Sequence, residues 1–251
     1  MRIFLTLLRR ELAAFFLAIT GYVIIASVTL LNSLSFVVLM TNLGDNPSPM
    51  PVTEMFYRTY FFWLVVLLAA PVITMRLFAL EKASGTFETL MTTPVGDLQV
   101  VAAKFAAAVI FYMVTWLPMI GCLLVVRQFT NQPGAALDAG TVGGMYLGIF
   151  LVGCLFLSLG CFASAISRTQ MGAAMVSFVL GATLFSVGFL AEALPATAQW
   201  QSQVLSYFGL FEQMHDFARG VVDTRTVTFY VSATFFFLFL ALRAVESRRW
   251  K

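Results

Sequence analysis

The chain has 251 residues, of which 60% are hydrophobic and only 11% carry a formal charge. Soluble domains carry roughly 25% charged residues, so this chain has too little charge to cover a soluble surface. The composition therefore excludes an ordinary soluble domain and predicts an all-α, polytopic membrane protein. The formal net charge of +3 becomes informative only when the charges are sorted by side of the membrane.

The first fifteen residues form an amphipathic pattern. The two faces differ in composition: one carries Phe4, Leu8, Leu12 and Phe15, and the other carries Arg2, Thr6 and Arg9. This pattern predicts a helix over residues 1–15 that lies in the cytoplasmic interface, although a simple extension of the first span fits equally well. A cleavable signal peptide is not expected, because Arg9 and Arg10 interrupt the apolar start.

Six runs are long enough to cross a bilayer, which needs about 20 apolar residues per helix. We expect transmembrane spans at residues 13–41, 56–77, 101–126, 141–166, 171–190 and about 226–243. Pro71 is expected to kink the second span, and Pro118 lies inside the third. Six spans place both termini on the same side of the membrane.

Polar connections separate several spans. The connection TNLGDNPSPMPVTE carries three prolines and is not expected to be helical, and RQFTNQPGAALDAG is a second polar connection. Residues 191–225 form a longer, mixed extracytoplasmic segment. Its apolar residues suggest short amphipathic helices that lie on the membrane surface or are partly re-entrant.

The basic residues indicate the orientation. Eleven of the fifteen Lys and Arg residues, but five of the twelve Asp and Glu residues, fall on the side of the termini and of the connection between spans two and three. Cytoplasmic loops carry the excess of Lys and Arg, so we expect the termini to be cytoplasmic.

The connection between spans two and three has unusual order for a loop. Ser84 or Gly85 is suited to begin a short helix, after which Phe87, Leu90 and Met91 share one face. Thr93-Pro94 is suited to begin a second helix, and Lys104 is suited to snorkel at the membrane edge. On periodicity alone, docking of this apolar face on a partner and contact with lipid headgroups remain equal alternatives.

The stretch EKASGTFETLMTTPVGDLQVVAAKF, residues 81–105, resembles the cytoplasmic segment of ABC-2 type transporter permeases. Glu81-Lys82, the Gly-Thr-Phe-Glu run at 85–88, Leu90-Met91, Pro94-Val95 and Lys104-Phe105 carry this likeness. With the six spans it covers the whole chain, residues 1–251, as a single ABC-2 type transmembrane domain. The closest likeness is to the permease group of gliding-motility and copper-maturation systems.

The resemblance implies a function and partners. It implies the permease subunit of an ATP-driven transporter, which we expect to be an exporter in a bacterial inner membrane. Residues 80–99, here called the coupling segment, would form a coupling helix that binds a separate ATP-binding subunit, present in two copies. The expected contact residues are Glu81, Gly85, Thr86, Phe87, Glu88 and Leu90. A second permease copy or a homologous permease would complete the transporter, with an extracytoplasmic accessory protein and the lipid bilayer as further partners.

No catalytic, cofactor-binding or metal-binding residue is expected in the chain itself. It contains no GxxxxGK[ST] phosphate loop, so ATP and Mg²⁺ are expected on the partner subunit. His215 lies between Glu212 and Asp216, where a solvated helix face is favoured over a metal site. Cys122, Cys154 and Cys161 lie in apolar runs and are expected to be small buried side chains. No nucleic-acid partner is expected.

Two further questions stay open at this stage. Gly140, Gly144 and Gly148 recur every four residues, and they fit helix packing within one subunit better than a dimer or gating seam. The alternatives to a transporter are a scaffold that transmits ATPase-driven motion to an extracytoplasmic partner, and a secondary carrier. The spans hold few charges and the chain has 26 phenylalanines, which favours an amphiphilic cargo over an ion-coupled carrier.

Overall fold

The computed structural model describes residues 2–45, 52–86, 96–129, 139–193 and 209–249. Within these ranges the secondary structure is helical and contains no strand. The helices are α1 (Arg2–Phe16), α2 (Ile19–Asp45), α3 (Val52–Arg58), α4 (Tyr60–Thr74), α5 (Ala79–Ala83), α7 (Asp97–Trp116), α8 (Pro118–Phe129), α9 (Ala139–Ile166), α10 (Gln170–Ala193), α12 (Leu210–Ala218) and α13 (Thr224–Arg249).

Among the residues that the structure describes, six stretches are long and apolar enough to cross a membrane, which confirms the predicted six-span plan. They are Ile19–Thr41, Tyr60–Ala83, Asp97–Val125, Gly140–Ile166, Gln170–Gly188 and Thr224–Ser247. The connection 41–54 was not expected to be helical, but α2 continues to Asp45 and α3 begins at Val52, so both of its ends are helical.

The first predicted span divides into two helices. α1 ends at Phe16 and α2 begins at Ile19, so the N-terminal helix is a separate element and not an extension of the span. Gly21 permits this bend, because a Cβ at this position would lie 2.1 Å from the carbonyl oxygen of Phe15. The placement of α1 in a membrane interface stays a prediction.

Proline accounts for the division of the third span. α7 ends at Trp116 and α8 begins at Pro118, which has no N–H to continue the helical hydrogen bonds. In the second span α4 contains Pro71 and ends three residues later at Thr74, before the turn that leads to α5.

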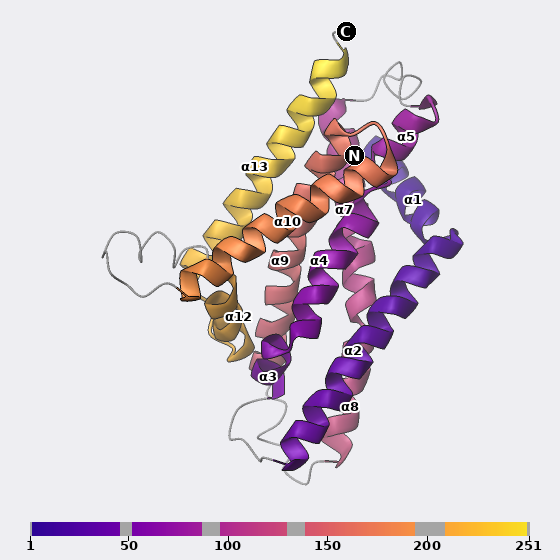
Figure 1. Cartoon of the computed structure of the whole chain (residues 1–251). Helices are drawn as coiled ribbons and strands as arrows, with labels where there is room; N and C mark the ends of the chain where they lie inside the picture. The colour runs from indigo at the N-terminus through magenta and orange to yellow at the C-terminus, as the bar shows by residue number, and fades with distance from the viewer. Residues whose placement is uncertain (1, 46–51, 87–95, 130–138, 194–208, 250–251) are drawn as a thin grey trace, which may run out of the picture.

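α9 is the central helix of the bundle. It contacts α4, α7, α10, α12 and α13, and 83% of its most apolar stretch is buried, against 11% for α13. Both termini and α5 lie toward one end of the bundle, whereas α3 and α12 lie toward the other (Figure 1). The fold thus places the start of the coupling segment at the end where the chain begins and finishes.

Candidate functional site

α5 is anchored to the carboxyl end of α9. The backbone N–H groups of Phe78 and Ala79 donate to the Ser164 hydroxyl, at 3.0 and 3.2 Å. The Lys82 ammonium donates to the Ala165 carbonyl and, at 3.4 Å, to the Ser167 carbonyl. The last carbonyls of a helix lack intrahelical donors, and a cation is favourable there. Two sets of bonds therefore hold the start of the coupling segment on the central helix.

Four charged side chains join α5 to two further helices. The Lys104 ammonium of α7 lies 2.8 Å from Oε1 of Glu81 and 3.1 Å from Oε1 of Glu11 on α1. Arg10 donates to the same two oxygens, at 2.7 Å to Glu11 and 3.3 Å to Glu81. The hydrogen bond to Glu11 raises the pKa of Arg10 above its ordinary value, so the guanidinium stays charged. We call Arg10, Glu11, Glu81 and Lys104 the ion-pair cluster.

Lys104 is the buried member of this cluster. Its side chain is 2% exposed, and its ammonium also lies 5.5 Å from the centre of the Phe78 ring. The prediction that Lys104 snorkels at the membrane edge is therefore wrong, because the side chain is enclosed by α1 and α5. A buried ammonium is tolerated only when it is paired, and two carboxylates provide that pairing here.

The predicted contact residues fall into three groups. Glu81 lies inside the ion-pair cluster, with a side chain that is 17% exposed. Gly85 and Thr86 are exposed at the end of the described stretch. Phe87, Glu88 and Leu90 lie outside the described residues, as does the helix start predicted at Thr93-Pro94. The Glu81 carboxylate thus faces Arg10 and Lys104, while its backbone carbonyl accepts a hydrogen bond from the exposed Thr86 at 3.4 Å.

Gly85 has a conformational role that spacing alone did not reveal. Its φ is +73°, and no heavy atom lies within 4 Å of a Cβ built on it. Gly85 was expected as a contact residue of the ATP-binding subunit, but within this chain glycine is required at this position by the left-handed backbone. The Ser84 and Thr86 hydroxyls lie 2.8 Å apart, and Ser84 donates to the Glu81 carbonyl at 3.2 Å. These bonds close the turn after α5.

The glycines of α9 pack against α12 of the same chain. A Cβ on Gly144 would lie 2.5 Å from the carbonyl oxygen of Phe217, and one on Gly148 would lie 3.1 Å from the Phe217 Cβ. A Cβ on Gly220 would lie 3.3 Å from the carbonyl carbon of Gly140. These contacts are the helix packing within one subunit that the spacing favoured.

Sequence reasoning missed a second cluster at the opposite end of the bundle. Glu54 of α3, with a side chain 2% exposed, pairs through both oxygens with Arg219, at 3.0 and 3.1 Å, and its Oε1 lies 3.2 Å from Nδ1 of His215. The Thr53 hydroxyl donates to the Ala218 carbonyl at 2.9 Å. His215, with a side chain 24% exposed, therefore contacts Glu54, while Glu212 and Asp216 on either side of it are exposed, as the favoured solvated helix face predicts.

A pattern in the sequence could have revealed this packing. Leu210, Met214 and Phe217 recur at i, i+4 and i+7, the spacing of an apolar helix face. All three are buried against the bundle. The expectation of short amphipathic helices in residues 191–225 is met by α12, while residues 194–208 lie outside the described ranges.

Comparison with known proteins gives one family. The family model described as ABC-2 family transporter protein matches residues 5–245, which is nearly the whole chain. No curated protein matches the chain.

Proposed function

The chain belongs to the ABC-2 family of transporter proteins, as a multi-pass membrane permease subunit whose family implies an ABC ATP-binding partner, and we propose that it forms an exporter in a bacterial inner membrane. In this proposal two ATP-binding subunits bind residues 80–99. The permease pairs with a second copy or with a homologous permease. The termini are cytoplasmic, and an extracytoplasmic accessory protein binds the segment 191–225.

The observation that carries this proposal is the attachment of α5 to three helices. Glu81 connects α5 to α1 and α7 through Arg10 and Lys104. Ser164 connects the start of α5 to the central helix α9. A displacement of α5 therefore acts on all three helices together, because charge-assisted hydrogen bonds fix their relative positions. This is the property that a coupling segment needs.

The orientation is supported by charge and position together. Cytoplasmic sides carry the excess of Lys and Arg. The side predicted to carry eleven of the fifteen basic residues is the end of the bundle where both termini and α5 lie (Figure 1).

The contacts of Glu81 change the role that we propose for it. Its carboxylate is engaged with Arg10 and Lys104, so we propose that Glu81 positions α5. The ATP-binding subunit would then contact Gly85 and Thr86, which are exposed, together with Phe87, Glu88 and Leu90.

Co-purification tests the proposed contact. The permease is co-expressed with its ATP-binding subunit and purified in mild detergent through a tag on that subunit. Thr86→Trp should reduce the recovered permease about tenfold, as expected for a bulky group at an interface. Ser247→Trp is the control, because Ser247 is exposed on α13 outside the coupling segment. Equal recovery of the two variants would contradict the contact.

Transport assays separate the alternatives. Inside-out vesicles containing the complex are tested with a panel of fluorescent amphiphilic dyes and lipids. An exporter accumulates a dye only when ATP is supplied. A scaffold hydrolyses ATP without moving any dye of the panel, and a secondary carrier moves a dye without ATP.

A further inference from the structure

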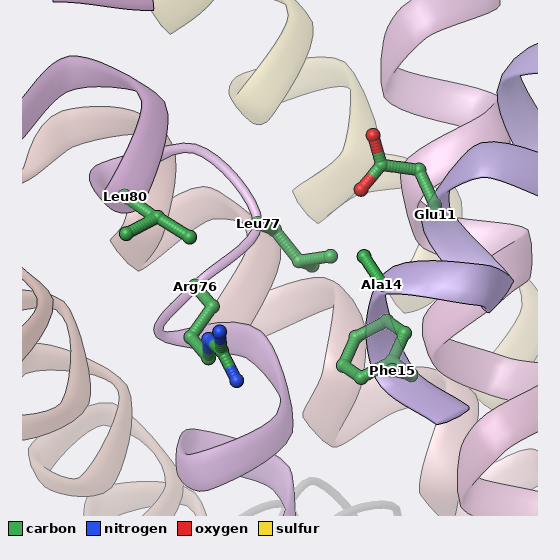
Figure 2. Close-up of a pocket in the computed structure, with 6 residues that line it drawn as sticks. All are labelled: Glu11, Ala14, Phe15, Arg76, Leu77 and Leu80. Carbon is green, nitrogen blue, oxygen red and sulfur yellow. The ribbon is translucent and has the colours of Figure 1, made fainter. Parts of the chain in front are cut away.

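A cavity lies between α1 and the junction of α4 with α5. α1 supplies one wall and the chain from the end of α4 to α5 supplies the other (Figure 2). The lining residues are Glu11, Ala14, Phe15, Arg76, Leu77 and Leu80. The cavity therefore adjoins the ion-pair cluster but has its own cation, Arg76, and its own apolar walls.

Arg76 retains most of its capacity to bind an anion. It donates to the Thr20 hydroxyl, and among the described residues no carboxylate lies within ion-pair distance of it. A guanidinium carries five N–H donors in a planar fork that matches phosphate and carboxylate oxygens. Its remaining donors are available to a ligand in the cavity.

The balance of charge favours an anionic ligand. Glu11 also lines the cavity, but its Oε1 is bonded to Arg10 and Lys104. The ion-pair cluster holds two cations and two carboxylates, so its formal charges cancel. Arg76 therefore leaves the region with one positive charge, which an anion would neutralise.

The apolar walls distinguish a lipid from a free anion. Ala14 and Leu80 are exposed at the cavity, while Phe15 and Leu77 are buried behind them. An inorganic ion makes no favourable contact with such walls, whereas the acyl chain of a lipid can pack against them. The cytoplasmic leaflet, which this end of the bundle faces in the proposed orientation, carries the anionic lipids.

We propose that this cavity binds an anionic phospholipid, with its phosphate on Arg76 and an acyl chain along Leu80 and Ala14. The proposal rests on the proposed function for the orientation of the bundle. The bound lipid would join α1 to the α4–α5 junction and so stabilise the position of the coupling segment.

Native mass spectrometry of the purified permease complex tests the site, with palmitoyl-oleoyl phosphatidylglycerol as the probe. Arg76→Gln should lower the affinity for the first bound lipid about tenfold, through the lost charge-assisted bonds. Ala14→Phe, which fills the cavity, should lower it as well, and Arg76→Lys should retain part of it. Arg243→Gln is the control, since Arg243 pairs with Glu246 on α13.

Three results would each contradict the proposal. Unchanged lipid binding in both Arg76→Gln and Ala14→Phe would show that the lipid does not bind in this cavity. Equal retention of phosphatidylcholine would contradict the choice of an anionic lipid, and displacement by millimolar inorganic phosphate would contradict the choice of a lipid. Thermal unfolding of each variant shows that it is folded.

The same samples report separately on the proposed function. If the ATP-binding subunit is absent from wild-type complexes while the lipid pattern is as expected, the proposed function fails and the lipid site stands. If the subunit is present and the lipid pattern is absent, the lipid site alone fails.

Discussion

Lys104 and Glu81 form an ion pair across 2.8 Å, and this pair joins a transmembrane helix to the start of the coupling segment. The two residues are 23 positions apart in the sequence and lie on α7 and α5. Because Lys104 is buried and Arg10 and Glu11 close the cluster from α1, the pair is part of the internal structure of the permease and not a surface contact.

Neutralising Glu81 should destabilise the permease. Glu81→Gln removes one of the two carboxylates that compensate the buried Lys104, at an expected cost of about 2 kcal/mol. Thermal unfolding in detergent should show a lower midpoint. Glu246→Gln is the matched control, because its pair with Arg243 is exposed and should contribute little.

The energetic coupling between Lys104 and Glu81 can be measured in a double-mutant cycle. Lys104→Met combined with Glu81→Gln should lower the free energy of unfolding by less than the sum of the losses in the two single variants. The reason is that the double variant leaves no unpaired buried ammonium. Strict additivity in the unfolding midpoints would show that the two side chains do not interact energetically.

The backbone at Gly85 gives a further prediction. Gly85→Ala must adopt a left-handed conformation, at a cost of about 1 kcal/mol, although there is room for the methyl group. We expect weaker co-purification of the ATP-binding subunit. Gly96→Ala serves as the control, since Gly96 has equal space and a φ of −69°. If the two alanine variants bind the subunit alike, the turn conformation is not required.

The packing of α12 on α9 predicts a contrast between adjacent residues. A Cβ at Gly144 overlaps the Phe217 carbonyl, so Gly144→Ala should cost about 2 kcal/mol. A Cβ at Gly143 meets no heavy atom within 4 Å, so Gly143→Ala should be neutral or slightly stabilising. The midpoints of thermal unfolding compare the two, and similar values would contradict the close approach.

The Glu54 cluster predicts that α12 depends on α3. Glu54→Gln removes the charge that pairs with Arg219, so hydrogen exchange in residues 209–220 should become faster. Glu212→Gln, on the exposed face of α12, is the control and should leave the exchange unchanged. Unaltered exchange in Glu54→Gln would show that packing of Leu210, Met214 and Phe217 alone holds the helix.

The spans were predictable because their signal is local. A bilayer requires about 20 apolar residues per helix, and each of the six runs satisfies this without reference to the others. The break at Pro118 and the apolar face of α1 follow from similarly local rules. The functional residues were less predictable. Glu81 was expected to face a partner, because a polar residue in a loop gives no sign of an internal counter-charge.

The amino-acid sequence by itself determined the membrane class, the six spans, the charge asymmetry and the stretch that resembles ABC-2 permeases. Only the tertiary structure decided that Lys104 is buried, that Glu81 and Glu11 share it, and that Glu54 pairs with Arg219 across 165 positions. Hydropathy and helical periodicity act within one segment, whereas an ion pair depends on which helices become neighbours. That choice is made by packing around α9, which no single segment encodes.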